Sequence, residues 1–222
     1  VYKRQVKNRA YSYEPDTLKG FRKSVLSYAN VGATSLFTTV EDMALWDRNF
    51  YTATVGGSEV IDMMHTQGIL NDGRQIKYAF GLEISRYRGL RTVGHSGGDA
   101  GYRSYILRFP DRRFSVIILS NLSTANPSML SRKLADIWLE YEFPEKPVEP
   151  EPVAKVEPSK LQSLAGTYHN PTIHTTYRIA YKEGKLYAQL GRDIELQAVS
   201  QERFRAAPLG PDTVVEFKPS GT

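Results

Sequence analysis

The residues of this chain that could do chemistry gather in one short stretch, Gly94-His95-Ser96-Gly97-Gly98. Read alone, the stretch has the G-x-S-x-G pattern of a nucleophile elbow, in which Ser96 would attack a carbonyl carbon. An elbow requires a helix directly after the serine, because the sharp strand-to-helix turn is what exposes the hydroxyl. The residues that follow therefore decide whether Ser96 can be a nucleophile.

A β-hairpin, not a helix, is expected after this stretch. Residues 102–109 and 114–120 are rich in aromatic and β-branched side chains, and Pro110-Asp111 supplies a turn between them. A triad in the elbow's chain order also needs a later histidine, and only His169 and His174 follow. An α/β-hydrolase with Ser96 as nucleophile therefore stays an alternative and is not the first interpretation.

The composition excludes several classes of site. The chain has 222 residues, a formal net charge of +5 and no cysteine, which rules out thiol catalysis, disulfides and cysteine-type zinc sites. No apolar run approaches the ~18–20 residues that span a bilayer. Two groups of arginines at expected hairpin tips are interpreted as solvated surface, so no nucleic-acid partner is expected: Arg86, Arg88 and Arg91, then Arg108, Arg112 and Arg113.

The two ends of the sequence predict a fragment. Residues 1–5 lack an initiator methionine and look like a translated cloning or sequencing scar. The other end stops just after an expected strand at 214–217. We therefore expect truncation at both ends, and the absence of a signal peptide then carries no information on the compartment.

The first part of the chain predicts helices that cover an antiparallel sheet. A hydroxyl of Thr38-Thr39 can cap a helix, with a carboxylate three residues further on. Apolar residues at helical spacing predict the buried stripe of that helix: Val40, Met43, Trp46 and Phe50. A short helix at 60–67 and strands at 78–86 and 90–95 follow, the strands joined by a turn at Tyr87-Arg88-Gly89.

The strand at 114–120 and the helix after it complete this part. The run Val116–Leu119 is apolar without alternation, so we expect both faces of the strand to be covered. Asn126 and Pro127 then begin a helix. Its buried stripe is predicted to consist of Leu130, Leu134, Ile137, Trp138 and Tyr141, with Trp46 and Trp138 both in the core.

A second domain is expected beyond a proline-rich linker. Residues 144–160 contain repeated Pro and Glu, a composition that stiffens a chain and buries no core. Residues 161–222 show short strands of alternating apolar residues, typical of a small antiparallel barrel or sandwich. A zinc site at His169 and His174 is not expected, since no third ligand lies near them.

Three ordered segments resemble the serine β-lactamase-like hydrolases, which include class C β-lactamases, D-aminopeptidases and esterases. Residues 31–46 look like the family's G-A-G-G-L-x-S-T-x-x-D-L-A-x-W segment. Residues 78–82 look like its Y-G-x-G-W strand, and residues 94–102 look like its G-H-[ST]-G-G-x-x-G-[FY] motif. The resemblance implies an α/β (α+β) β-lactamase/transpeptidase-like fold, an antiparallel sheet flanked by helices, incomplete and spanning 1–143. Residues 161–222 are similar to the lipocalin-like barrel that often follows, also incomplete.

The resemblance assigns the site residues. His95, Ser96 and Gly97 match the third catalytic motif of the family, the N–H of Gly98 matches the oxyanion-hole donor, and Tyr102 lines the substrate site. The family's nucleophile sits in a Ser-x-x-Lys and its second motif is a Tyr-x-Asn. No acceptable Ser-x-x-Lys is present, and the Tyr-x-Asn at Tyr28–Asn30 stands too close to the first segment and is interpreted as a coincidence.

The implied function is acyl-enzyme hydrolysis by a longer parent protein. The fragment alone is expected to be inactive, with no cofactor or metal, and to take a small-molecule or peptide substrate. A histidine where β-lactamases carry lysine favours esters, amides or D-amino-acid peptides, because histidine is only partly charged near neutrality. A non-catalytic penicillin-binding-protein-like binding module remains an alternative. A periplasmic, secreted or cell-surface location is only what the resemblance suggests.

Overall fold

The computed structural model describes residues 6–26, 32–145, 154–170, 174–191, 193–206 and 213–218. Contacts divide the chain into two compact units, Val1–Pro147 and Val148–Thr222. Within the described ranges, no helix is long and apolar enough to cross a membrane. Part of the expected linker, residues 146–153, lies outside the described residues.

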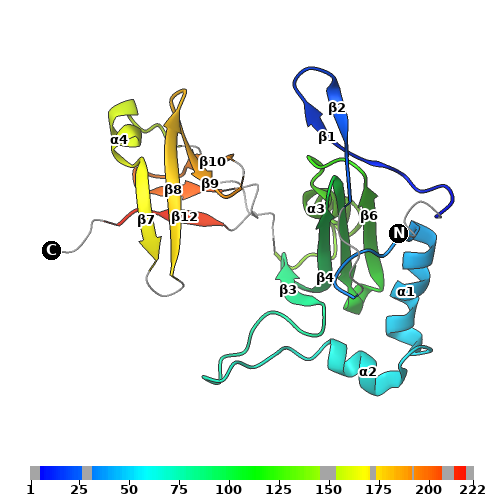
Figure 1. Ribbon diagram of the computed structural model, residues 1–222. Coiled ribbons are helices and arrows are strands. Elements are labelled where there is room, and N and C mark those ends of the chain that lie inside the picture. The colour runs from blue at the N-terminus through cyan, green and yellow to red at the C-terminus, as the bar shows by residue number, and fades with distance from the viewer. Residues whose placement is uncertain are drawn as a thin grey trace. The chain divides into compact units, whose positions relative to one another are not determined.

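The first unit is built on an antiparallel sheet with the strand order β3-β4-β5-β6 among the described residues (Figure 1). Its strands are β3 (Glu83–Tyr87), β4 (Leu90–Asp99), β5 (Tyr102–Phe109) and β6 (Phe114–Ser120). A separate hairpin precedes them, formed by β1 (Ser12–Asp16) and β2 (Gly20–Ser24). The β5–β6 hairpin expected from the sequence is confirmed, with the short 3-10 helix Pro110–Arg112 at its turn.

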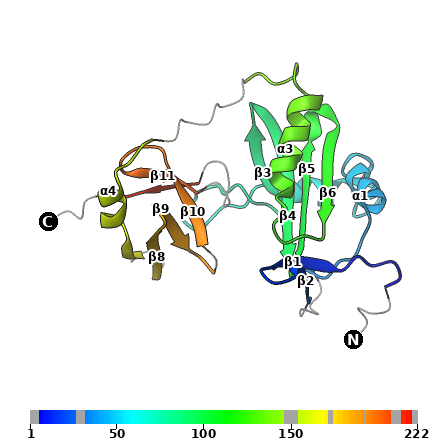
Figure 2. The same ribbon diagram turned by 90° about the horizontal axis from the view of Figure 1, so that it is seen from above.

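Helices cover both faces of this sheet. The helices α1 (Val40–Thr52) and α2 (Gly57–Met64) supply Phe50 and Ile61, which pack against Val93 and Ile84. The helix α3 (Pro127–Trp138) packs Ala135 against Leu107 on the opposite face. Figure 2 shows α3 in front of the sheet and α1 beside β6. The Thr39 hydroxyl caps α1 by accepting the N–H of Asp42, as the sequence predicts.

The structure corrects the expected phase of α3. Its buried positions are Pro127, Ser131 and Ala135, continued by Leu139 just after the helix. The predicted stripe of large apolar residues instead faces outward: Leu130, Leu134, Ile137, Trp138 and Tyr141 are all exposed, Trp138 at 72%. Small residues lie against the sheet because α3 and β5 approach closely, and periodicity alone cannot show which of two apolar stripes is buried.

Other expectations also need correction. The apolar run in β6 is not covered throughout, since β6 is an edge strand and Leu119 is 41% exposed. The strand expected at 78–86 begins only at Glu83, because Ala79–Leu82 form a turn closed by the bond from the Ala79 N–H to the Leu82 carbonyl. The expected helix at 60–67 begins earlier, at Gly57, and ends at Met64. Trp46 is not a core residue either, being partly exposed beside Phe50.

Arg108 is the clearest exception to the interpretation of the arginines as solvated surface. Its side chain is 1% exposed, and its Nε donates to the Asp47 carboxylate. The guanidinium also lies 4.0 Å from the ring centroid of Phe50. The residue sits on β5 under α1 and not at a hairpin tip, so its charge is part of the interior of this unit.

The second unit is an antiparallel meander that curls on itself. Its order among the described residues is β12-β11-β10-β9-β8-β7. These strands are β7 (Gly166–Asn170), β8 (Thr175–Lys182), β9 (Lys185–Gln189), β10 (Asp193–Ala198), β11 (Arg203–Arg205) and β12 (Val214–Glu216), preceded by the helix α4 (Pro158–Ser163). The ring of Tyr168 on β7 lies 5.4 Å from that of Phe217, just after β12. The two edge strands are thus brought together around a core that includes Leu186, Ile194 and Phe204.

Candidate functional site

The stretch His95–Gly98 lies inside β4, which runs four residues past the expected end of its strand. β5 pairs with β4 from Val93 to Asp99, but the pairing of β4 with β3 ends at Gly94. In the part of the chain that the structure describes, the other edge of His95–Asp99 therefore has no strand beside it. Backbone N–H and C=O groups on this free edge can bind a ligand.

Successive residues of β4 face opposite sides of the sheet, so the candidate residues divide between its two faces. His95 and Gly97 share a face with Val93, which is buried under α1 and α2, whereas Ser96 and Gly98 belong to the face that α3 covers. Ser96 pairs with Tyr105 in mid-strand, and no helix follows it. The nucleophile elbow is therefore not built here, since it needs a strand-to-helix turn at the serine.

Both ring nitrogens of His95 are hydrogen bonded. Nδ1 lies 2.6 Å from the backbone oxygen of Ser96, and Nε2 lies 2.9 Å from the hydroxyl of Tyr78. The Tyr78 and His95 rings meet edge to face, with centroids 5.8 Å apart. Sequence reasoning finds His95 but not Tyr78, because the sequence pattern puts Tyr78 in a strand and its reach to His95 depends on the turn at Ala79–Leu82.

The close approach of the neighbouring strand β5 explains why two positions of β4 are glycine. A Cβ at Gly94 would lie 2.3 Å from the backbone oxygen of Ile106, a contact that cannot be relieved without moving β5. At Gly97 the same atom would meet the Ser104 hydroxyl at 2.2 Å. Gly98 has more room, with the Arg103 side chain as the nearest neighbour at 3.5 Å. Of the three, Gly98 could accept a side chain with the least disturbance of the sheet.

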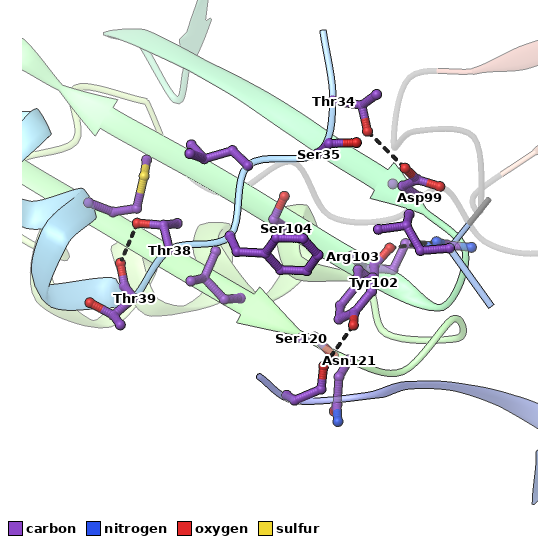
Figure 3. Close-up of a pocket in the computed structure, with 18 of the residues that line it drawn as sticks. Thr34, Ser35, Thr38, Thr39, Asp99, Tyr102, Arg103, Ser104, Ser120 and Asn121 are labelled. Carbon is purple, nitrogen blue, oxygen red and sulfur yellow. Dashed lines mark hydrogen bonds between the residues drawn. The ribbon is translucent and has the colours of Figure 1, made fainter. Parts of the chain in front are cut away.

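A cavity of 960 Å³ lies beside this part of β4 (Figure 3). His95 to Asp99, the facing residues of β5 and β6, and the segment 32–39 line it. Thr34 donates a hydrogen bond of 2.8 Å to the Asp99 carboxylate, which ties this segment to the end of β4. Thr34 and Ser35 stand where the family pattern has two glycines, and Ser35 keeps a left-handed φ of 72°. The segment thus holds a glycine-type conformation while presenting hydroxyl groups.

Tyr102 also lines the cavity. Its hydroxyl donates to the backbone oxygen of Ala10 at 2.7 Å, and its ring meets Phe37 edge to face. The aromatic ring, more than the hydroxyl, is therefore what Tyr102 offers to a ligand. Tyr28 and Asn30 lie outside the described residues. The described residues contain no cluster of three or more His, Cys, Asp or Glu side chains that could hold a metal ion.

The comparisons with known proteins agree with the sequence segments. Residues 2–137 match the family model described as Beta-lactamase. A D-aminopeptidase from Brucella canis is 25% identical over 198 residues, which cover 88% of this chain and 36% of that protein. A D-aminopeptidase from Gluconobacter oxydans is 25% identical over 131 residues, covering 59% of this chain and 25% of that one. The chain thus spans about a third of the length of the Brucella relative.

A solved structure shows a similar fold. The octameric penicillin-binding protein homologue from Pyrococcus abyssi superposes with a TM-score of 0.57 and 21% identity, covering 91% of this chain and 48% of that one. At this identity the likeness bears on the fold alone. It is consistent with a mixed α/β unit on an antiparallel sheet, followed by a curled sheet.

Proposed function

Because this chain belongs to the Beta-lactamase family, we propose that it forms one side of an acyl-enzyme site in a serine hydrolase. This is the side that the third catalytic motif of the family provides. The observation that carries the proposal is the position of His95–Gly98 on the free edge of β4, beside the cavity. A substrate carbonyl placed along this edge meets a backbone N–H, which is the group that an oxyanion hole requires.

The proposed mechanism divides hydrolysis into acylation and deacylation. A serine activated by a neighbouring base attacks the carbonyl, and the tetrahedral oxyanion is stabilised by the N–H of Gly98. His95 borders the same edge and contacts the substrate from the face that it shares with Gly97. Collapse of the tetrahedral intermediate breaks the bond to the amine or alcohol, which leaves with the proton that the base took from the serine. Water then attacks the acyl-serine carbonyl, and the base transfers a proton from the water to the serine oxygen as the carboxylic acid is released. Ser96 contributes its backbone carbonyl, which fixes the His95 ring.

We propose that the nucleophile belongs to a longer protein of which this chain is one part. None of the 222 residues forms a Ser-x-x-Lys, and the match to the Brucella relative covers 36% of that protein. The Ser-x-x-Lys and the Tyr-x-Asn would precede residue 6 and complete the site. On this proposal the chain alone does not hydrolyse substrate.

The proposed substrate is an amide or ester of a D-amino acid. Two relatives named D-aminopeptidase support this class, and the histidine at position 95 supports it over a carboxylate-bearing β-lactam. A lysine is a permanent cation that suits a substrate carboxylate, whereas a histidine carries a full charge only at acidic pH. A penicillin-binding-protein-like module that binds peptides without cleaving them is the competing assignment.

Steady-state hydrolysis by the longer protein tests the proposal. D-alanine p-nitroanilide, its L-enantiomer, a simple ester and a β-lactam are compared, and we expect the D-anilide or the ester to react fastest. His95→Ala should lower kcat/KM at least about tenfold, or ~1.4 kcal/mol of transition-state stabilisation, because it removes the ring that borders the substrate edge.

A matched variant separates loss of the site from loss of the fold. His169→Ala removes a histidine from the second unit and should leave kcat/KM unchanged. Binding of the D-amino-acid amide without any turnover would favour the non-catalytic module. Full activity in His95→Ala would show that His95 is not part of the active site.

For the second unit we propose a lipocalin-like barrel. Its support is the sequential antiparallel order of β7 to β12 and the contact of Tyr168 with Phe217, which brings the edge strands together. Limited proteolysis of the chain tests it. A protease-resistant piece that spans residues 154–222 and melts cooperatively would support the proposal, and rapid degradation of this part would oppose an independent barrel.

A further inference from the structure

The environment of His95 fixes where the proton of its ring lies. The Ser96 backbone oxygen, 2.6 Å from Nδ1, can only accept a hydrogen bond, so Nδ1 carries the proton. In the neutral ring Nε2 is then an acceptor, and the Tyr78 hydroxyl, 2.9 Å away, is its donor. The carbonyl sets the tautomer, and the tyrosine binds the remaining lone pair.

Tyr78 is itself held by the backbone around it. Its carbonyl oxygen accepts the N–H of Gly68 at 2.8 Å, and it forms a bridge with Glu83 at the start of β3. Its ring meets the His95 ring edge to face, with an interplanar angle of 63°. The hydroxyl and the ring together therefore restrict rotation of the imidazole about its side-chain torsions.

We infer that Tyr78 is a positioning residue of the site, which orients the His95 ring toward the substrate by donating a hydrogen bond to Nε2. The inference rests on the proposed function only for the role of His95. The hydrogen bond and the tautomer can be tested without substrate. A ring held before the substrate arrives needs no reorganisation during the reaction, which is the advantage of a preorganised site.

Nitrogen-15 NMR of the histidine rings tests the inference on the chain itself. The chain has four histidines, so long-range proton–nitrogen spectra above pH 8 give four separable ring patterns. We expect His95 to show a protonated Nδ1 and a hydrogen-bonded, unprotonated Nε2. In Tyr78→Phe the Nε2 resonance of His95 should move to that of a free lone pair, while the other three patterns stay in place.

A matched control uses the same substitution elsewhere. Tyr87→Phe also removes a bonded hydroxyl, the donor to Asp136, and should leave the His95 pattern unchanged. An Nε2-protonated His95 in the wild type would overturn the inference. So would a His95 pattern that is identical in the wild type and in Tyr78→Phe.

Activity of the longer protein gives a second readout. Tyr78→Phe should lower kcat/KM about tenfold, the effect of one lost hydrogen bond, and unchanged kcat/KM would contradict the positioning role. Absence of hydrolysis in the wild-type protein would instead count against the proposed function, while the NMR result would still decide whether Tyr78 binds His95.

Discussion

Arg108 and Asp47 form an ion pair between β5 and α1, and the arginine is the most deeply buried charge among the described residues of the first unit. Ser115 on β6 also donates to Asp47, at 2.9 Å. The Asp47 carboxylate therefore links α1 to two strands of the sheet that carries the candidate site. Removing it would leave the guanidinium buried without its counter-charge.

We expect Asp47→Ala to lower the free energy of unfolding of the first unit by about 3–5 kcal/mol, as for other buried pairs that lose one partner. Glu142→Ala, which removes the partner of the exposed Arg112, should cost no more than about 1 kcal/mol. Urea unfolding followed by tryptophan fluorescence measures both, since Trp46 and Trp138 lie in this unit. Equal losses in the two variants would contradict the interior role of the Arg108 pair.

His65 predicts an acid-dependent loss of stability. Burial, with the Arg108 and Arg91 charges, lowers the pKa of His65 below its ordinary value of 6.5, and Asp62 opposes this shift. His65 binds its proton less tightly in the folded state than in the unfolded state. Its contribution to the free energy of unfolding is therefore complete above pH 6.5 and is lost as the pH falls toward the lowered pKa. The free energy of unfolding should therefore decrease as the pH is lowered through this window.

His65→Gln tests this pH dependence, because glutamine keeps an acceptor for the Arg108 guanidinium, 3.3 Å from Nε2. Its stability should fall less steeply than that of the wild type as the pH is lowered below 6.5. The two proteins differ only at position 65, so the difference between their pH curves isolates the contribution of His65. Parallel pH curves would show that His65 does not carry the effect.

The phase of α3 gives a prediction opposite to the one that the sequence suggests. Trp138 is 72% exposed, so Trp138→Ala should change the free energy of unfolding by no more than about 0.5 kcal/mol. Ala135 is 0% exposed against the sheet, so Ala135→Leu should cost about 1–3 kcal/mol through overpacking. Chemical denaturation followed by circular dichroism measures both, and a reversed order of the two costs would show that the stripe with Trp138 faces the sheet.

Residues 100 and 101 form the β4–β5 turn, and neighbouring substitutions there should have opposite effects. A Cβ at Gly101 would lie 2.5 Å from the Tyr13 carbonyl oxygen, so Gly101→Ala should cost about 1–3 kcal/mol. Ala100 has a φ of 47°, and this left-handed conformation costs ~1–2 kcal/mol for a side chain. Ala100→Gly should therefore leave stability unchanged or higher, which thermal unfolding can check; a clear loss in Ala100→Gly would contradict this interpretation of the turn.

Local signals in the sequence are sufficient to predict the elements that capping and turn residues delimit. The Thr39 cap, the Arg88-Gly89 turn and the β5–β6 hairpin each follow from residue types within a few positions. The proposal that residues 161–222 form a lipocalin-like barrel stays a prediction.

Features that depend on distant contacts could not be predicted. Arg108 looks like a surface residue until α1 places Asp47 over it, and Tyr78 looks like a strand residue until a turn brings its hydroxyl to His95. The burial of Ala135 in place of Trp138 depends on how closely α3 approaches the sheet. Each of these is set by residues more than a dozen positions away in the sequence.

The identity of the serine that reacts as the nucleophile tests the central claim most directly. The proposed longer protein is treated with a serine-reactive fluorophosphonate and digested, and the labelled peptide is identified by mass spectrometry. The proposed function predicts a single label on a serine of a Ser-x-x-Lys that precedes residue 6. A label on Ser96, or no labelled serine in a folded protein that binds D-amino-acid amides, would contradict an acyl-enzyme site bordered by His95 to Gly98.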